Sequence, residues 1–468
     1  MVTTPSSVHI AIFPFMSKGH TIPLLHLAQL LHHRCLTSTI TFFTTPLNSP
    51  FIRQSLTGVK ANVIELPFPE NIPDLPPGIE STDRLPSMLL FLPFIHAVKQ
   101  LQPLFEETLK NLPTINLLIS DGFLSWSRDS SAKFNIPRMV FYGMGNFATT
   151  ISAIVATEKP HRHVSSYDEP FSVTPFPHLK FTKSDFSPPF DDPDPKGPMV
   201  EFVYEQVIAT RQSHGIIVNS FYELDEPYLD YWNKNIGPKA WCVGPLCLMA
   251  KLNVELDQSL EEQRRACMQW LDVRSTSNRP VLYVAFGSQA HVPAVQLQEI
   301  AVALEKSEID FLWVIRDEDA EFGEFEQKVQ DRGMVVHKWV DQVEILRHES
   351  IKGFMSHCGW NSVMESVTAG VPILAWPMIA EQHLNAKFVV EEMKVGLGIR
   401  MRGRDELIKS EHIEEMVREL MAGEGGKEVA RNVKVLSDKA KMAMDGGSSW
   451  SSLEVMISEV SSINSFSS

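Results

Sequence analysis

The sequence has few cysteines and no apolar run long enough to cross a membrane. Its five cysteines are scattered over 468 residues without a Cys-x-x-Cys pair, which argues against a disulfide framework and against a cysteine-based zinc site. The N-terminus lacks the basic-then-apolar order of a signal peptide. The longest apolar stretch, Val371–Ala380, is interrupted by Pro372 and Pro377, whereas a spanning helix needs about 20 apolar residues. We therefore expect a cytoplasmic protein without a membrane span.

An excess of basic residues is also missing. Lysine and arginine number 42 against 57 aspartates and glutamates, which gives a net charge of −15. Nucleic acids and anionic membranes are bound by basic surface, so neither is expected as the main partner. Hydrophobic residues make up 44% of the chain and charged residues 21%, as in globular proteins. The length predicts two or three domains.

What the sequence does contain is a regular alternation of short apolar runs and longer amphipathic stretches. Runs rich in β-branched and aromatic residues, bounded by turn residues, indicate buried strands. Helical patterns such as Leu24–His33 and Met88–Leu112 lie between them. The alternation predicts an α/β fold with parallel sheets built from βαβ units. The expected strands are His9–Phe15, Ile40–Phe43, Asn62–Leu66, Ile115–Ser120, Arg138–Tyr142, Gly215–Asn219, Val281–Phe286, Phe311–Ile315, Ile351–Met355 and Pro372–Ala375.

The alternation pauses at Val243–Ser259 and then restarts, which indicates a linker between two doubly wound domains. We place an N-terminal domain at residues 1–243, the linker at 244–259 and a second domain at 260–445. The tail, residues 446–468, is expected to be a helix that packs back on the N-terminal domain. The Pro, His and Asp-rich insertion Glu158–Pro198 fits a lid or binding loop as well as a disordered segment.

The densest polar chemistry lies in the 44 residues from Trp339 to Gln382. The strand expected at Ile351–Met355 is followed by a tight turn and then by a helix that ends near Gly370. Either Asn361 or Ser362 is expected to cap that helix. A glycine-containing turn that leads into a helix N-terminus is an anion site, because backbone N–H groups and the positive end of the helix dipole point outward together.

Simpler interpretations of the same residues remain open. Ser362 and Glu365 have the Ser-x-x-Glu spacing of a capping box, which would only secure the start of the helix. Trp339 follows an apolar strand and fits a core position. Glu381 and Gln382 fit the start of the next helix.

Taken together, this segment closely resembles the signature box of the plant family-1 UDP-glycosyltransferases. The shared anchors are the opening Trp, the HCGWNS core, the Glu three residues after the serine, the GVP tripeptide and a closing acidic-Gln pair. The resemblance extends along the whole chain. It implies the GT-B fold, in which two Rossmann-like doubly wound domains face each other across a cleft that holds the active site.

The resemblance also implies a role for each matching residue. Trp339 would stack on uracil, the backbone of Val340 and the side chain of Gln342 would hold uracil and ribose, and Glu365 would accept from the ribose hydroxyls. The diphosphate would be bound by Ser288, His357, Asn361 and Ser362, and the sugar would be contacted by Trp360, Glu381 and Gln382. The chain departs from the family at Asp341, where the family usually has proline. An aspartate supports a turn through its side chain, so we expect a looser loop and a retained site, with the contact through Gln342 in doubt.

A histidine and an aspartate follow two of the expected N-terminal strands. His20 comes after the first strand and Asp121 directly after Ile115–Ser120. Ligands of open parallel sheets bind at the carboxyl ends of the strands, so these side chains can meet in one crevice. A lone histidine at such a turn is more often a cap or surface residue, but in the family the matching pair is the general base and the residue that holds it. A histidine is suited to deprotonate an acceptor near neutral pH, and a carboxylate fixes its tautomer.

These residues predict an inverting transfer of glucose from UDP-glucose to a small apolar acceptor such as a flavonoid, a phenolic or a terpenoid, giving a β-glucoside. In the family, Gln382 favours glucose over galactose and Trp360 argues against a glucuronic acid donor. UDP-glucose is a substrate, and neither a cofactor nor a metal is expected, because we see no Asp-x-Asp pair placed to hold a divalent ion. We expect a monomer. Aromatic residues near the strand ends fit core positions or an acceptor pocket, and the pocket candidates are Phe15, Phe91, Phe123, Phe141, Met144, Phe147 and Phe190.

Two other functions remain as alternatives. Gly143–Ala148 follows the strand Arg138–Tyr142 and fits the G-x-G-x-x-A pattern of a nicotinamide-dependent oxidoreductase, but it falls late in the domain instead of in the first βα turn. The second alternative is a non-catalytic UDP-sugar-binding protein, against which the intact His20 and Asp121 argue.

Overall fold

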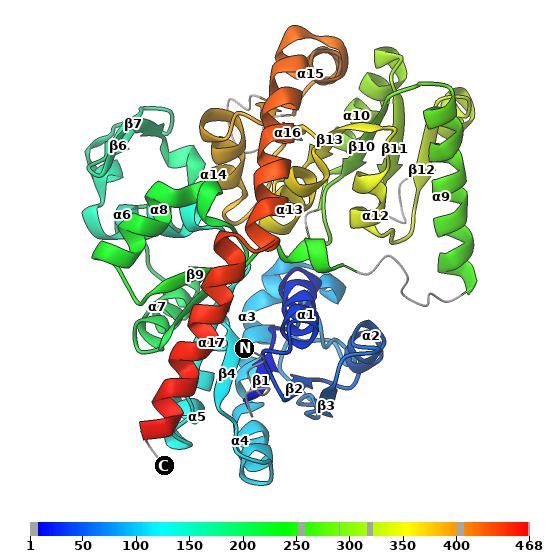
Figure 1. The fold of residues 1–468 in the computed structure, drawn as a ribbon. Helices are drawn as coiled ribbons and strands as arrows, with labels where there is room; N and C mark the ends of the chain where they lie inside the picture. Colours follow the sequence, from blue (N-terminus) through cyan, green and yellow to red (C-terminus); the bar gives the residue numbers. More distant parts are fainter. Residues whose placement is uncertain (1–7, 251–257, 290, 316–321, 400–406, 467–468) are drawn as a thin grey trace. The chain divides into compact units, whose positions relative to one another are not determined.

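The computed structural model describes residues 8–250, 258–289, 291–315, 322–399 and 407–466, which form two compact units (Figure 1). Unit 1 consists of Met1–Ala153, Asp194–Lys251 and Met442–Ser468, and unit 2 of Ile154–Pro193 and Leu252–Lys441. Most of the insertion thus belongs to unit 2, although it lies between two segments of unit 1 in the sequence. Of the expected linker, the described part contains a short 3-10 helix, η5 (Leu246–Met249), and residues 251–257 lie outside the described residues.

Unit 1 is built on a seven-stranded sheet in which every pair of neighbours is parallel. The strand order is β3-β2-β1-β4-β5-β8-β9, so that consecutive strands run outward in both directions from β1. This is the order of a doubly wound sheet. The strands are β1 (His9–Phe13), β2 (Thr39–Thr44), β3 (Ala61–Glu65), β4 (Leu117–Asp121), β5 (Arg138–Tyr142), β8 (Gly215–Val218) and β9 (Ala240–Cys242).

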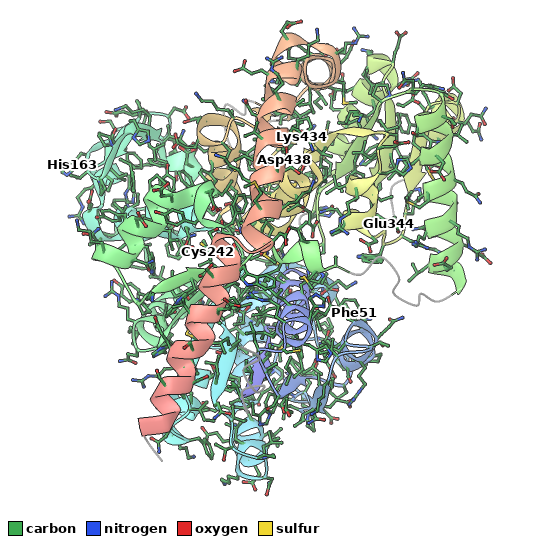
Figure 2. All side chains as sticks on the ribbon, viewed as in Figure 1. Phe51, His163, Cys242, Glu344, Lys434 and Asp438 are labelled. Carbon is green, nitrogen blue, oxygen red and sulfur yellow. The ribbon has the colours of Figure 1, made fainter. Side chains whose placement is uncertain are left out.

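Helices cover both faces of this sheet because successive side chains of each strand point to opposite sides. Ile10 and Ile12 of β1 join the core formed with α1 and α17, and Ala11 and Phe13 join the core formed with α3 and α4. Cys242, labelled in Figure 2, ends the edge strand β9. The helices of unit 1 are α1 (Lys18–His33), α2 (Ser49–Ser55), α3 (Phe91–Lys99), α4 (Gln102–Lys110), α5 (Ser127–Lys133), α6 (Asn146–Glu158, which continues into unit 2), α7 (Pro198–Arg211), α8 (Tyr222–Asn235) and α17 (Ser448–Phe466).

The stretch Met88–Leu112, expected as one helix, is three: the 3-10 helix η2 (Met88–Leu90), α3 and α4. Pro103 lies in the first turn of α4, where its missing N–H costs nothing, and it prevents α3 from continuing. By length and composition, Met88–Asn111 is the one stretch of the described residues that could cross a membrane. Of its 18-residue apolar window 33% is buried, and Phe94 and Phe105 within the stretch are fully buried in the core of unit 1.

Unit 2 contains a six-stranded parallel sheet in the order β12-β11-β10-β13-β14-β15. Its strands are β10 (Val281–Ala285), β11 (Asp310–Val314), β12 (Gly333–Val336), β13 (Ile351–Ser356), β14 (Ile373–Ala375) and β15 (Gly396–Gly398). Its helices are α9 (Gln258–Thr276), α10 (Ala294–Ser307), α11 (Gly323–Val329), α12 (Gln342–Arg347), α13 (Trp360–Ala369), α14 (Gln382–Lys387), the π-helix η6 (Phe388–Glu392), α15 (Ser410–Ala422) and α16 (Glu424–Met444, whose last residues fall in unit 1).

The insertion has an ordered structure of its own. The strands β6 (Phe171–Val173) and β7 (Phe176–Phe181) form a short antiparallel hairpin. The rings of Phe171 and Phe186 stack on each other. The hydroxyl of Ser187 donates to the carbonyl of Ala380 in the same unit (2.6 Å). The disordered alternative for this segment is therefore set aside.

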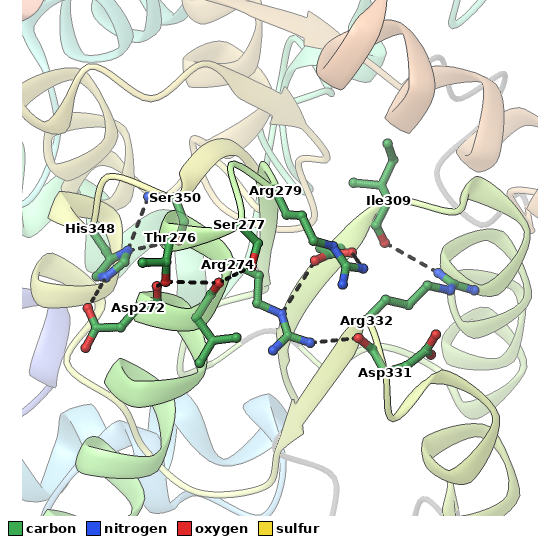
Figure 3. A network of polar contacts seen from close by, with 12 residues as sticks. Asp272, Arg274, Thr276, Ser277, Arg279, Ile309, Asp331, Arg332, His348 and Ser350 are labelled. Carbon is green, nitrogen blue, oxygen red and sulfur yellow. Dashed lines mark hydrogen bonds and ion pairs between the residues drawn. The ribbon is translucent and has the colours of Figure 1, made fainter.

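A charged network closes the amino-terminal edge of the sheet in unit 2 (Figure 3). Asp310, the first residue of β11, accepts from Arg279 (2.5 Å) and forms an ion pair with Arg274 (3.5 Å). Arg274 also donates to the carbonyl of Asp331 (2.8 Å), and His348 contacts Asp272 on α9 (3.2 Å). These contacts stabilise the edge at which the strands begin. Ligand sites of parallel sheets lie at the opposite edge, where the strands end.

The C-terminal helix α17 is part of the core of unit 1. Its Leu453, Met456, Ile457 and Val460 are buried in the cluster that contains the β1 residues Ile10 and Ile12. Beside this buried stripe of α17, Arg34 forms an ion pair with Glu454 (2.7 Å) and lies over the ring of Trp450 (3.4 Å from its centroid). The tail therefore contributes apolar burial to a sheet that begins more than 400 residues earlier in the sequence.

We predict that Leu453→Ala destabilises unit 1 by about 2–5 kcal/mol, because it leaves a cavity in a fully buried position. Val455→Ala is the matched control, since Val455 is 48% exposed on the same helix and its change is expected to stay within about 0.5 kcal/mol. Thermal melting, together with hydrogen exchange of the peptides that cover α1 and α17, measures the effect. Equal protection in the two variants would contradict the packing described.

Candidate functional site

In each sheet the strands are added outward from one central strand, first on one side and then on the other, which gives one topological switch point per sheet. The residues expected to carry function follow the strands at these two switch points. In unit 1, β1 lies between β2 and β4, with Phe13 opposite Ser120. In unit 2, β10 lies between β11 and β13, with Ala285 opposite Ser356. At such a switch point the connections leave on opposite faces of the sheet, which opens a crevice at the carboxyl ends of the two strands.

His20 and Asp121 meet at the switch point of unit 1. His20 lies in the first turn of α1, and Asp121 is the last residue of β4. Nδ1 of His20 is 2.7 Å from Oδ2 of Asp121, whose side chain is fully buried while that of His20 is 19% exposed. The other carboxylate oxygen, Oδ1, accepts from the backbone N–H of Phe123 (2.9 Å). The imidazole is thus held through Nδ1 and retains access to solvent.

Aromatic rings surround this histidine. The ring of Phe123 lies 4.7 Å from the imidazole and that of Phe15 lies 5.4 Å away, centroid to centroid. Phe91 contacts both Phe15 and Phe123 edge-on, and it is only partly buried. Sequence reasoning missed a fourth phenylalanine ring, Phe202 on α7, which packs against Phe91 and Phe123 (5.8 and 5.4 Å). No local motif marks Phe202, because only the fold brings α7 to this place.

The other expected pocket residues do not join this group. Phe141 is fully buried in the core on the α1 face of the sheet, and Phe147 is buried edge-on against Tyr228 (4.8 Å). Met144 is partly buried in the loop after β5. Phe190 belongs to the insertion and hence to unit 2.

In unit 2, a short turn connects β13 to α13. The helix begins at Trp360 with Gly359 as its N-cap, so the expected cap at Asn361 or Ser362 is wrong by two or more positions. Glycine supplies no capping side chain, and Ser362 lies in the first turn, so the Ser-x-x-Glu pair is no capping box. Cys358 adopts φ 61°, which turns the chain sharply into the helix. A first turn whose N-cap provides no side chain leaves backbone N–H groups that can bind an anion.

His357 lies against two glycines at this turn. A Cβ atom added to Gly359 would be 2.5 Å from Nε2 of His357, and one added to Gly287 would be 2.6 Å from the same atom. Gly287 also has φ +78°, a conformation that side chains rarely adopt. Ser288 follows Gly287 in the loop after β10 and is partly exposed. The turns after β10 and β13 therefore approach each other closely around one imidazole.

Gln342 connects α12 to α13. Its amide nitrogen donates to the hydroxyl of Ser362 (2.9 Å) and to the carboxylate of Glu365 (2.7 Å), and its oxygen accepts from the hydroxyl of Tyr283 (3.4 Å). Burial raises the pKa of Glu365 to about 7, and the nearby charge of Asp341 acts in the same sense, while the bond from Gln342 opposes them. Glu365 is thus a carboxyl group that changes charge near neutral pH.

Asp341, which stands where the family usually has proline, is the N-cap of α12. Its carboxylate accepts from the backbone N–H groups of Val343 (3.0 Å) and Glu344 (3.2 Å). The aspartate thus supports the turn through its side chain, as expected, and the contact between Gln342 and Glu365 is present.

Trp339 and Val340 form the segment before this cap and are both partly buried. The carbonyl of Trp339 accepts from Gln263 on α9 (3.0 Å). Arg264 on the same helix makes a two-pronged ion pair with Glu344, labelled in Figure 2 (2.7 and 2.6 Å). Trp339 and Val340 contribute to a small hollow, whose other lining residues are Leu260, Arg264, Cys267, Met268, Asp341, Glu344 and Ile345.

The closing pair of the segment starts α14, as the simpler interpretation allowed, with Glu381 as its N-cap. The side-chain oxygen of Gln382 accepts from the backbone N–H groups of Met378 and Ile379 (both 3.0 Å). Trp360 is 2% exposed, so most of its indole is core. Sequence reasoning missed Asn385, whose amide donates to the carbonyl of Cys358 (3.0 Å) and to Glu381 (3.4 Å) and so joins the turn before α13 to the start of α14.

Comparison with known proteins identifies the family. Residues 236–445 match the family model described as UDP-glucoronosyl and UDP-glucosyl transferase. The chain is 49% identical to UDP-glycosyltransferase 90A1 of Arabidopsis thaliana, over 97% of this chain and 96% of the relative. It is 34% identical to scopoletin glucosyltransferase of Nicotiana tabacum, over 98% and 99% of the two chains. The chain belongs to the plant family-1 UDP-glycosyltransferases.

A solved structure supports the same conclusion at the level of the fold. UGT73P12 of Glycyrrhiza uralensis, solved with glycyrrhetinic acid 3-O-monoglucuronide, superposes with a TM-score of 0.87 at 31% identity, covering 98% of this chain and 96% of that one. The fold is GT-B, with two Rossmann-like units, and the chain is a glycosyltransferase that binds a UDP-sugar and a small acceptor. The family decides against the oxidoreductase alternative, and the Gly143–Ala148 segment follows β5, away from the switch point between β1 and β4.

We predict that uridine binds more tightly as the pH rises from 6 to 8, by about tenfold, if the ribose hydroxyls donate to Glu365. The pKa of this carboxyl in the free protein is about 7. Below pH 7 the protonated carboxyl group must first lose its proton before it can accept hydrogen bonds from both hydroxyls, and this cost disappears above pH 7. Uridine is used because it has no phosphate that titrates in this range. Titration calorimetry at several pH values measures the effect.

Two controls isolate the contact. Glu365→Gln should bind uridine more weakly and without the pH dependence, and 2′,3′-dideoxyuridine should bind the unchanged protein with little dependence on pH. A wild-type affinity for uridine that stays constant between pH 6 and 8 would remove Glu365 from the ribose site.

Proposed function

We propose that the enzyme transfers glucose from UDP-glucose to a hydroxyl of a small apolar acceptor by direct displacement with inversion at the anomeric carbon. The observation that carries this proposal is the 2.7 Å contact between Nδ1 of His20 and the buried carboxylate of Asp121. A carboxylate at Nδ1 keeps the proton on that nitrogen. Nε2 then has a lone pair with which to accept a proton.

The chemistry follows from this tautomer. Nε2 of His20 takes the proton of the acceptor hydroxyl as its oxygen bonds to C1 of the sugar, and the bond between C1 and the phosphate oxygen breaks with its electron pair going to UDP. Asp121 stabilises the imidazolium that forms. Displacement from the face opposite to UDP turns an α-linked donor into a β-glucoside. Because unit 1 carries the base and unit 2 the proposed donor site, the reaction needs both units.

The leaving diphosphate gains negative charge as this bond breaks. We assign its stabilisation to the first turn of α13, which has no capping side chain, together with His357, Asn361, Ser362 and Ser288. Backbone N–H groups and the helix dipole are fixed before the reaction, so they need no reorganisation when charge develops. Uridine would be held through Trp339, Val340, Gln342 and Glu365.

Glucose is the proposed donor sugar. The oxygen of Gln382 is engaged by two backbone N–H groups, so its amide nitrogen is the group that would donate to a sugar hydroxyl, beside Glu381 and the edge of Trp360. The name of the tobacco relative, a glucosyltransferase, supports the same donor.

The acceptor is proposed to be planar and aromatic or terpenoid-like. Phe15, Phe91, Phe123 and Phe202 form an apolar wall beside the imidazole and favour edge-to-face contacts with an aromatic ring. The five cysteines are all free in the structure, which suits the reducing cytoplasm that we propose as its location.

The proposal is tested with purified protein, UDP-glucose and a panel that includes scopoletin, flavonols, simple phenols and terpenoid alcohols, with release of UDP as the readout. His20→Ala should lower kcat/KM by about 10²-fold or more while UDP binds with unchanged affinity. His33→Ala is the matched control, because His33 is exposed on the same helix and should retain full activity. Turnover by His20→Ala at the wild-type rate would remove the proposed base.

The stereochemistry has its own test. The coupling constant of the anomeric proton in the isolated product distinguishes a β-glucoside from an α-glucoside. An α-linked product would exclude direct displacement with inversion even if His20 proved essential.

A further inference from the structure

A buried arginine lies directly beneath the turn that carries Asp121. Arg138 opens β5, next to β4 in the sheet, and its side chain is on the face that also buries Phe13 and Leu118. The residue is 2% exposed. Its guanidinium donates to the carbonyls of Asp121 and Leu124 (both 3.4 Å).

Three serine hydroxyls complete the surroundings of the guanidinium. Nε donates to Ser120 (2.7 Å) and Ser127 (3.0 Å), and Nη1 donates to Ser213 at the end of α7 (2.7 Å). All five acceptors are neutral oxygens, and within the described part of the chain no carboxylate makes an ion pair with Arg138. Burial of a cation without an ion-pair partner costs free energy of desolvation. We therefore ask what the charge and the hydrogen bonds of Arg138 do for the residues around it.

Asp121 is the buried carboxylate whose charge acts on Arg138. Burial lowers the pKa of Arg138 to about 10, and the attraction of Tyr142 and Asp121 opposes this shift, with smaller effects from Arg128 and Asp129 on α5. Arg138 therefore stays charged at neutral pH. Burial raises the pKa of Tyr142, whose hydroxyl is hydrogen-bonded to Thr210 (2.7 Å), so Tyr142 is neutral in this range. Asp129 is largely exposed, which leaves Asp121 as the buried charge of opposite sign.

We propose that Arg138 is a positioning residue of the His20–Asp121 pair, which fixes the turn from Asp121 to Leu124 through two carbonyls and limits the pull of Asp121 on a proton at His20. This inference rests on the proposed role of His20 as the base. The positive guanidinium attracts the same carboxylate that stabilises the imidazolium, and it thereby weakens that stabilisation. His20 consequently remains neutral, and able to accept a proton, at a lower pH than it would beside Asp121 alone.

The two parts of the proposal are separated by two substitutions in the full-length protein. Arg138→Gln removes the charge, and the acid limb of the pH profile of kcat/KM should move to higher pH by about one unit, because His20 then holds its proton more tightly. Arg138→Lys keeps the charge and loses the planar fork, so the limb should stay in place while kcat falls about tenfold. Ser213→Ala removes one acceptor without a change in charge and should leave both quantities near the wild type.

The profile of kcat/KM for the acceptor is measured from pH 5 to 9 at saturating UDP-glucose, so that the ionisation of Glu365 predicted to affect nucleotide binding does not enter it. The acceptor is geraniol, whose hydroxyl does not ionise in this range, or hydroquinone if geraniol is not turned over. Melting temperature and UDP affinity establish that each variant is folded. An acid limb that stays in place in folded Arg138→Gln overturns the electrostatic part, and full kcat in Arg138→Lys overturns the positioning part. If Arg138→Gln does not fold, Arg138→Lys still decides the second part, and Arg138→Met with the same profile decides the first.

Failure of the proposed role of Arg138 can be distinguished from failure of the proposed function. Wild-type turnover by His20→Ala would remove the base itself and with it the acid limb that Arg138 is said to move. Loss of activity in His20→Ala, combined with an unmoved limb in Arg138→Gln, would leave the base in place and reject only the role of Arg138.

Discussion

The parallel pairing of β1 with β4 and of β10 with β13 is the constraint on which both sites depend. Hydrogen-bonded neighbours that run in the same direction must end at the same edge of the sheet. Phe13 lies opposite Ser120, so the residues that follow β1 and β4 leave the sheet side by side. Ala285 and Ser356 are related in the same way in unit 2. Residues about 100 positions apart in sequence thereby come within a hydrogen bond of each other, as His20 and Asp121 do.

Burial also shifts the pKa of several charged groups close to these two strand edges. Desolvation raises the pKa of Glu365 and of Asp341, and it lowers that of Arg138. The backbone at the edges is also unusual, because Cys358 and Ala380 have positive φ without being glycine. Such conformations cost about 1–3 kcal/mol each and persist where the surrounding structure fixes them, as the amide of Asn385 does at the carbonyl of Cys358.

Most of the buried parallel strands could be predicted from the sequence, whereas some of the short ones could not. Buried parallel strands are continuous apolar runs, and Arg138–Tyr142 matches its strand to the residue because Pro137 and Gly143 bound it. Strands β9, β12 and β15 were missed, although β8 and β14 are equally short and were predicted, so an apolar run of three or four residues is not a dependable signal. Long-range contacts were equally hidden. Phe141 and Phe202 look alike in the sequence, but only the tertiary fold places Phe202 near His20 and Phe141 in the opposite core.

Asp341 shows how a site can keep its geometry when a family residue is replaced. Its φ of −74° is one that proline would also adopt, so the exchange requires no change of backbone at this torsion. The two side chains differ in what they add. Proline would fix the torsion and reduce the freedom of the unfolded chain, whereas aspartate binds two N–H groups at the start of α12 that proline would leave uncapped. The aspartate also brings a negative charge close to Glu365, which helps to raise its pKa. The replacement thus caps the helix that presents Gln342 and, at the same time, adds to the effect of burial on the pKa of the neighbouring carboxyl.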